Sequence, residues 1–259
     1  MPKIWMLQKS SFGLGNFIMA TPAIRLLSEK QGRRVKVFFE TASIGLLYKE
    51  CPFIKVLLKK PNKRPFYTIG GIKRKSAEND IQASCRILKV GGKNIPHTYV
   101  DPVETSVFSR TEEDKCVAVF HGCLGKCFRG RKDVGAKTRQ YIIDRLGEEG
   151  FKIILLGTSS DYKHYWSQNN LKNVENFLGK YSLNDSVGIL RKCDSFISND
   201  TGLYHVASAL KIKGLVLWKK TRFGKNKSPF EGIEHCVSKE GDFDIYKKSI
   251  DLQIGRILS

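Results

Sequence analysis

Short apolar runs alternate with helix-forming segments along this chain, and the alternation occurs twice. In the N-terminal part the predicted order is strand, helix, strand, helix, strand, over residues 3–8, 17–30, 33–40, 42–51 and 54–60. In the C-terminal part the alternation returns over residues 116–122, 134–150, 151–159, 182–193, 194–200, 202–210 and 214–218. Strands that alternate with helices form parallel sheets with helices on both faces. The pattern therefore predicts two doubly wound α/β domains that bind ligands at the carboxyl ends of their strands.

Two prolines and mixed polar residues make residues 94–115 the best candidate for a linker between these domains. We predict an N-terminal domain over residues 1–108 and a C-terminal domain over residues 109–259, with a ligand-binding cleft between them. No apolar run approaches the roughly 18 residues that a membrane span needs, and the N-terminal apolar stretch is too short for a signal peptide. The expected location is therefore the cytoplasm.

The chain carries a net charge of +20, and residues 1–110 contribute +13 of it. Charge of this size predicts an anionic partner: nucleic acid, an anionic membrane surface or a phosphorylated glycan. The seven cysteines are scattered and form no C-x-x-C pair. This favours reduced thiols in the core over a zinc site, although Cys123 and Cys127 lie close to His121 in the sequence.

Gly13, Leu14, Gly15 and Asn16 form a glycine loop between the first predicted strand and the first predicted helix. Glycines at this position allow a ligand to approach the backbone, and the helix that follows presents free N–H groups. The loop lacks the third glycine of the dinucleotide-binding fingerprint. A tight turn without any ligand explains it equally well.

The segment "SNDTGLYHVASAL", residues 198–210, ends a strand and opens a helix. Asp200 or Thr201 can cap this helix, and Gly202 allows a phosphate to approach its N-terminus. His205 lies one turn further along and can face the same ligand. Spacing alone leaves two interpretations open, an anion site or a capped helix with a buried histidine.

This segment resembles the D-[ST]-G-x-x-H-[LV]-A-[AS]-A-L signature of the glycosyltransferase family 9 enzymes, the heptosyltransferase family. Residues 13–27, "GLGNFIMATPAIRLL", are similar to the G-x-G-[DN] and TPA[IL]RxL segments of that family, and "FKIILLGTSSD" and "GLVLWKKT" resemble later segments in the same order. The resemblance implies a GT-B fold, with the acceptor on one Rossmann-like domain and the nucleotide-sugar donor on the other. It also implies inverting transfer without a bound metal or other cofactor.

The resemblance implies roles for several residues of these segments. The resemblance implies that Asp200, Thr201, Gly202 and His205 contact the donor phosphates or the donor sugar. It further implies that Gly15 and Asn16 face the transferred sugar and the acceptor from across the cleft.

Asn16 stands where heptosyltransferases place an aspartate that is proposed as the general base. An amide cannot take a proton from an acceptor hydroxyl as a carboxylate can. Glu40, at the end of the second predicted strand, is our candidate for that role, and a solvated strand end is the alternative.

A glycine loop rich in cations follows the first strand of the C-terminal domain. Without a metal, a leaving pyrophosphate needs cations and N–H donors to stabilise its charge. We predict that this loop belongs to the donor site, although each cation alone could be a solvated surface charge. The candidates are Lys126, Arg129, Arg131 and Lys132.

Residues 51–77 contain eight Lys or Arg residues and no acid. Cations interleaved with aromatic rings suit a phosphate backbone with bases or sugars stacked beside it, whereas the alternative is a solvated loop. The predicted acceptor-binding residues are Lys59, Lys60, Lys63, Arg64, Phe66, Tyr67, Lys73, Arg74 and Lys75.

Together these features predict a glycosyltransferase that moves a sugar from a nucleotide-diphosphate sugar to a hydroxyl of a polyanionic acceptor. The charge of the acceptor domain favours DNA with hydroxymethylated bases, as modified by viral enzymes, in the cytoplasm of a host cell. The resemblance to the family favours a different acceptor, an anionic glycolipid such as lipopolysaccharide core, or another surface glycan. A third hypothesis, motivated by Asn16, is a non-catalytic nucleic-acid-binding protein on a glycosyltransferase scaffold.

Overall fold

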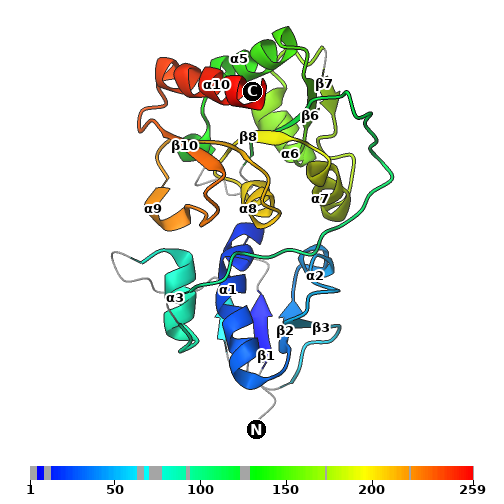
Figure 1. Ribbon diagram of the computed structural model, residues 1–259, viewed down its shortest axis with the longest axis vertical. Coiled ribbons are helices and arrows are strands. Elements are labelled where there is room, and N and C mark those ends of the chain that lie inside the picture. Colours follow the sequence, from blue (N-terminus) through cyan, green and yellow to red (C-terminus); the bar gives the residue numbers. More distant parts are fainter. Residues whose placement is uncertain are drawn as a thin grey trace.

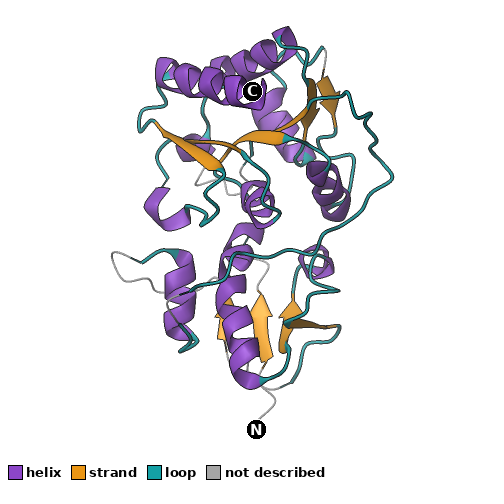
Figure 2. Cartoon of the chain, viewed as in Figure 1, coloured by secondary structure: helices purple, strands orange, loops and turns teal. Residues whose placement is uncertain are grey.

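A computed structural model gives the structure of the chain, and its strands form two separate parallel sheets (Figures 1 and 2). We call each sheet with its helices a lobe, the first lobe being N-terminal and the second C-terminal. The predicted α/β class with two parallel sheets is confirmed. The structure describes residues 5–8, 13–62, 67–69, 78–91, 94–122, 129–172, 174–221 and 223–258.

The first lobe holds a four-stranded sheet in the order β3-β2-β1-β4. Its strands are β1 (Trp5–Gln8), β2 (Val35–Phe39), β3 (Ile54–Leu57) and β4 (Tyr67–Ile69). Its helices are α1 (Leu14–Gln31), α2 (Ala42–Leu46) and α3 (Asp80–Ile87). The sequence predicted β1, β2 and β3. Residues 59–80, with two prolines and a glycine pair, gave few signals of ordered structure, so β4 within them is a correction to the prediction.

The second lobe holds a six-stranded sheet in the order β10-β9-β8-β5-β6-β7. Its strands are β5 (Cys116–Phe120), β6 (Lys152–Leu155), β7 (Val174–Asn176), β8 (Ser195–Asn199), β9 (Gly214–Trp218) and β10 (Ile233–Val237). Its helices are α4 (Arg129–Lys132), α5 (Ala136–Glu148), α6 (Ser159–Asp161), the π-helix η2 (Tyr162–Trp166), α7 (Leu183–Arg191), α8 (Gly202–Ala209), α9 (Phe223–Asn226) and α10 (Phe243–Leu258).

Both faces of the six-stranded sheet are buried under helices. Along β5 alternate side chains belong to different core clusters: Ala118 packs on the side of α7 and α8, and Val119 on the side of α5 and α10. Successive side chains of a strand point to opposite faces, so a strand covered on both sides must be apolar throughout. This is why the sequence over β5 reads as a continuous apolar run.

Helix α1 tolerates a proline in its interior because a neighbouring hydroxyl replaces the missing donor. Pro22 has no N–H to give to the carbonyl of Ile18, four residues earlier. The hydroxyl of Thr21 donates to that carbonyl instead, at 2.7 Å, and accepts the N–H of Tyr99 at 2.8 Å. The helix therefore remains continuous and also anchors the chain segment that leads to the second lobe.

The connection between the lobes is bonded to both of them. On the first lobe the N–H of Asp101 donates to the carbonyl of Leu47 at 2.9 Å. On the second lobe the ammonium of Lys192 donates to the carbonyls of Thr105 and Phe108, each at 2.7 Å. The boundary that we placed after residue 108 remains a prediction.

Two further observations concern the described residues alone. None of the described helices is long and apolar enough to cross a membrane. The five cysteines described, Cys51, Cys85, Cys116, Cys193 and Cys236, are buried free thiols.

Candidate functional site

The second sheet has a topological switch point between β5 and β8. From β5 the chain moves outward to β6 and β7, and it then returns to β8 on the other side of β5. Parallel sheets bind ligands at the carboxyl ends of their strands at such a point. There the N–H of Gly122, after β5, donates to the side-chain oxygen of Asn199, the last residue of β8, at 3.3 Å. The segment that opens α8 follows directly.

Lys132 and Asp200, both predicted as donor-binding residues, lie in contact at this point. The Lys132 ammonium is 3.0 Å from Asp200 Oδ2 and donates to the Asp200 carbonyl at 2.7 Å. The side-chain amide of Asn226 donates to the same Oδ2 at 3.2 Å. Asp200 is only 3% exposed. Its carboxylate therefore holds a cation and a loop in place at the end of β8.

Helix α8 presents unused N–H groups beside this ion pair. The Thr201 hydroxyl accepts the N–H of Tyr204 at 3.4 Å and so caps the helix. No acid lies in the first turn, and within the described residues the N–H groups of Gly202 and Leu203 find no acceptor. Free N–H groups and the positive end of the helix dipole attract an anion. Together with Lys132 they form a candidate site for an anion.

The N-terminus of α1 meets that of α8 from the first lobe (Figure 1). A Cβ placed on Gly15 would lie 2.5 Å from Cδ2 of the His205 ring, and one on Gly202 would lie 3.3 Å from Cβ of Leu14. Only glycine allows the Gly15 backbone to approach the ring so closely. The first turn of α1 also lacks an acid. The positive ends of two helices, one from each lobe, therefore converge here.

His205 is buried at this contact and is neutral at pH 7. Burial lowers its pKa to about 4; Asp200 acts against this shift, and Lys132 adds to it. The Nδ1 atom is buried and forms no hydrogen bond with any residue that the structure describes. A neutral imidazole offers one donor and one acceptor rather than a positive charge. His205 can therefore orient a hydroxyl or a phosphate oxygen by hydrogen bonding.

Tyr204, Asn226 and Ser228 belong to the site although the sequence analysis did not select them. The Tyr204 hydroxyl donates to the carbonyl of Asn226 at 3.3 Å and accepts the N–H of Ser228 at 2.5 Å. The Ser228 hydroxyl is also bonded to that of Ser208 in α8. These bonds fix the loop that brings Asn226 to Asp200. No sequence signal pairs Asn226 with a residue 26 positions earlier.

The remaining predicted residues are placed as follows. Asn16 lies in the first turn of α1, and Glu40 is exposed at the carboxyl end of β2, where its N–H donates to the carbonyl of Gln8 at 3.0 Å. Their roles in catalysis stay predictions. Arg131 is exposed on α4, and only the backbone of Arg129 is described.

The predicted acceptor residues are described only in part. Lys59 and Lys60 are exposed just after β3. Tyr67 lies in β4 rather than in a loop, and burial raises the pKa of its hydroxyl to about 12. The others, together with Lys126 of the donor loop, lie outside the described residues: Lys63, Arg64, Phe66, Lys73, Arg74 and Lys75.

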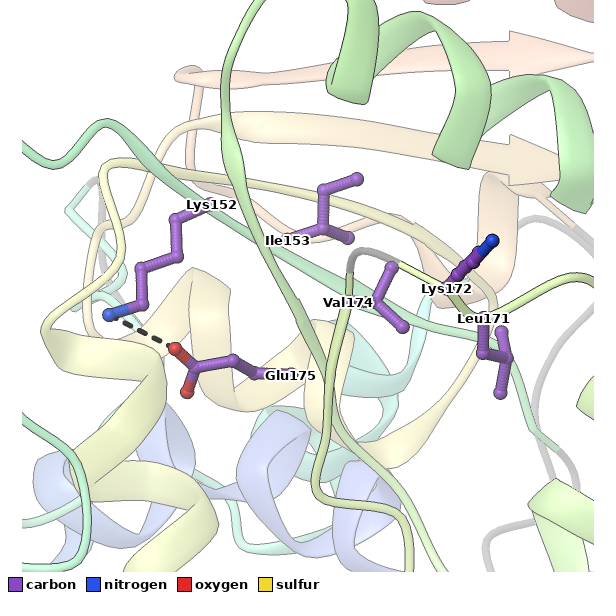
Figure 3. Close-up of a pocket in the computed structure, with 6 residues that line it drawn as sticks. All are labelled: Lys152, Ile153, Leu171, Lys172, Val174 and Glu175. Atoms are coloured by element: carbon purple, nitrogen blue, oxygen red, sulfur yellow. Dashed lines mark ion pairs between the residues drawn. The ribbon is translucent and has the colours of Figure 1, made fainter.

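A pocket of about 350 Å³ lies at the outer edge of the second sheet (Figure 3). Lys152 and Glu175, on neighbouring strands β6 and β7, form an ion pair across it at 3.0 Å. None of the residues predicted for donor or acceptor lines it. In the part of the chain that the structure describes, no group of three or more His, Cys, Asp or Glu side chains could hold a metal. Metal-independent transfer stays a prediction.

Residues 131–244 match the family model described as glycosyltransferase family 9 (heptosyltransferase). This part of the chain is similar to glycosyltransferase family 9. The match includes Lys132, Asp200, Thr201, Gly202 and His205, and so confirms the resemblance found in the sequence. A search of curated proteins found no match to the chain.

Solved structures of family 9 glycosyltransferases share the fold. A family 9 glycosyltransferase from Veillonella parvula has a TM-score of 0.77 at 13% identity, over 99% of this chain and 97% of that one. The ADP-heptose lipopolysaccharide heptosyltransferase II of E. coli has a TM-score of 0.70 at 14% identity, over 98% of both chains. The E. coli heptosyltransferase WaaC with ADP has a TM-score of 0.70 at 13% identity, over 97% of this chain and 99% of that one. The predicted GT-B fold of two Rossmann-like lobes is confirmed.

Proposed function

We propose that this protein transfers a sugar from a nucleotide-diphosphate sugar to a hydroxyl of an anionic acceptor, by inversion and without a metal. The observation that carries the proposal is the convergence of Lys132 and two helix N-termini at the carboxyl end of β8. A donor diphosphate bound there would place its negative charge against the Lys132 cation and the two positive helix ends. The match of residues 131–244 to the glycosyltransferase family 9 model supports the reaction class.

The site suits the departure of a nucleoside diphosphate. Negative charge grows on the leaving phosphate as the bond to the sugar breaks, and prearranged donors are most effective against charge that develops in this way. Lys132 supplies a cation, and the N–H groups of Gly202 and Leu203 supply uncharged donors. The buried Asp200 holds the Lys132 ammonium at the site through their ion pair.

The transferred sugar would lie between the lobes, against Gly15 and His205. His205 would hydrogen-bond a sugar hydroxyl or a phosphate oxygen without adding charge. The acceptor hydroxyl must lose a proton, and the Asn16 amide cannot take it. Glu40 remains our candidate base, at the same edge of the first sheet from which α1 begins.

We favour a glycan over DNA as the acceptor. One similar structure is a heptosyltransferase named for lipopolysaccharide, whereas no comparison supports the DNA acceptor that the charge of residues 1–110 favoured. That charge remains compatible with a phosphorylated glycan.

Mass spectrometry tests this function. Lipopolysaccharide core oligosaccharide and a hydroxymethylated oligonucleotide are each incubated with the protein and a panel of nucleotide sugars, with Asp200→Ala as the inactive control. We expect a mass gain of one sugar on the oligosaccharide. A gain on the oligonucleotide alone would restore DNA as the acceptor, and failure to turn over any nucleotide sugar would refute the glycosyltransferase activity.

A further inference from the structure

Arg139, near the start of α5, is a buried cation. Only 2% of this residue is exposed. Its guanidinium forms an ion pair with Asp133, and its Nε atom donates to the side-chain oxygen of Asn169 at 3.4 Å. The ring centres of Tyr165 and Trp166 lie 5.6 Å and 5.9 Å from the Arg139 Cζ atom. A buried charge is costly unless it is paired, so these surroundings hold the guanidinium against Asp133.

Two neutral neighbours direct the Arg139 cation toward Asp133. The side-chain amide of Asn169 donates to the carbonyl of Ala136 at 3.0 Å, which leaves its oxygen turned to Arg139. His121 is uncharged at pH 7, because burial lowers its pKa well below the usual value and Arg139 lowers it further. Of these groups Asp133 is the one that carries a negative charge. It is therefore the natural partner of the guanidinium.

Asp133 also closes the turn that leads into α5. Its Oδ1 atom accepts the N–H of Gly135 at 2.9 Å in addition to the Arg139 guanidinium. Gly135 has a φ of +91°, which residues other than glycine rarely adopt. One carboxylate oxygen thus joins the start of α5 to the backbone that directly follows Lys132.

The backbone around Lys132 is bonded at three consecutive residues. The carbonyl of Arg131 accepts the N–H of Lys220, after β9, at 2.9 Å. The carbonyl of Lys132 accepts the side-chain amide of Asn199, at the end of β8, at 3.0 Å. Asp133 adds the bonds described above. The direction of the Lys132 side chain therefore depends on contacts from both the sheet and α5.

We propose that Arg139 is a positioning residue for donor binding, which acts through Asp133 to hold the turn that aims the Lys132 ammonium at the candidate anion site. The inference rests on the proposed glycosyltransferase function. The Arg139 side chain is only 3% exposed, so it acts through Lys132 and not on the substrate itself. Without Arg139, the Asp133 carboxylate turns to water, the turn loosens, and the ammonium leaves Asp200 more often.

Arg139→Met tests the proposal, because methionine fills much of the buried space of the arginine stem but carries no charge. Arg139→Lys is the conservative variant, since a lysine keeps the cation and can still bond to Asp133. Arg145→Met is the matched control. Arg145 also lies on α5, and it forms ion pairs with Glu148 and Glu149 rather than with the turn. Circular dichroism with thermal denaturation confirms that each variant is folded.

The first readout is the reactivity of Lys132, which needs no ligand. Lysines are acetylated with limiting N-hydroxysuccinimide acetate, and mass spectrometry gives the rate at each residue. Lys132 should react slowly in the wild type, because its ammonium is paired with Asp200 and its side chain is only 17% exposed. The rate at the exposed Lys172 is the internal reference.

We expect Arg139→Met to raise the acetylation rate of Lys132 severalfold and to leave that of Lys172 unchanged. Arg139→Lys should restore most of the protection, and Arg145→Met should match the wild type. A folded Arg139→Met variant with the wild-type rate at Lys132 would overturn the proposal.

The second readout is the Kd for ADP, measured by titration calorimetry with and without Lys132. Arg139→Met should raise this Kd about fivefold in the wild-type background and leave it unchanged in the Lys132→Ala background, because the effect passes through Lys132. Equal losses in both backgrounds would show a general structural role for Arg139 and would overturn the proposal.

The two proposals can fail separately. A wild-type protein that turns over no nucleotide sugar would refute the glycosyltransferase function, whereas the acetylation rates would still decide whether Arg139 positions Lys132. A protein that transfers sugar, but whose Lys132 reacts alike in the wild type and in Arg139→Met, would keep the function and overturn the role of Arg139.

Discussion

The two lobes contribute to the site in different ways. The second lobe supplies buried side chains that bond to one another, with Asp200 between Lys132 and Asn226 and with Tyr204 behind them. The first lobe supplies mainly backbone at the described positions, namely the N-terminus of α1 and the close approach of Gly15. The second-lobe side of the candidate anion site is therefore held by bonds within a single lobe. Contacts from the first lobe depend on how closely the two helices meet.

The largest effect is expected from the second lobe, at Lys132. Lys132→Ala removes the cation and leaves a buried Asp200 without its ion-pair partner, which costs more than the pair itself contributes. We expect release of nucleoside diphosphate from the donor to slow by about 10²-fold or more. Lys239→Ala, at an exposed position, should match the wild type. A Lys132→Ala variant with wild-type turnover would show that the anion binds elsewhere.

Gly15 tests the contribution of the first lobe. In Gly15→Ala the new methyl group would lie 2.5 Å from the His205 ring, so the ring or the helix must move. We expect turnover to fall about tenfold and the free energy of unfolding to fall by about 1–3 kcal/mol. Gly147→Ala is the matched control, because its Cβ meets nothing within 4 Å in the exposed part of α5. That control should be neutral or stabilising by up to about 1 kcal/mol.

A smaller effect is expected at Tyr204, whose hydroxyl bonds the backbone of the loop that carries Asn226. Tyr204→Phe keeps the ring but leaves the N–H of Ser228 without its acceptor. We expect a loss of about 1–3 kcal/mol in the free energy of unfolding. The KM for the donor should rise severalfold because Asn226 is no longer held against Asp200. An unchanged KM with lowered stability would mean that the loop does not influence donor binding.

Acid should weaken the second lobe specifically. Burial lowers the pKa of His205 to about 4 and that of His121 well below its usual value, and both lie in this lobe. The unfolded chain takes up these protons below about pH 6.5, so stability is complete above that pH and is lost as the pH falls toward 4. His205 alone should contribute about 1.4 kcal/mol per pH unit within this window. Urea denaturation at several pH values measures the slope, which His205→Asn should reduce; an unchanged slope would contradict the buried, neutral state of this histidine.

The sequence predicted the central strands of both sheets and missed β4, β7 and β10, each of which lies at an edge of its sheet. Apolar runs revealed β5, β6 and β9, because strands buried on both faces are mostly apolar. Strand β8, whose sequence is SFISN, was predicted as the strand that ends just before α8. Strand β4 was missed because its three residues lie among prolines, glycines and cations.

The site itself could be predicted only where it is local in sequence. Asp200, Thr201, Gly202 and His205 lie in one segment, and their spacing shows that they share a helix N-terminus. The contacts of Asn226 with Asp200 and of Gly15 with His205 join residues far apart in the chain. Such contacts depend on how the loops and lobes pack, which no local pattern encodes.

The most direct test is hydrogen–deuterium exchange of the wild-type protein with and without saturating ADP, the nucleotide of the WaaC structure. If a diphosphate binds where the two helices converge, exchange should slow at the amides of Gly202 and Leu203 in α8 and of Leu14 and Gly15 in α1. Lys132→Ala should abolish this protection. ADP that leaves these amides unprotected, or that protects them equally without Lys132, would contradict the site.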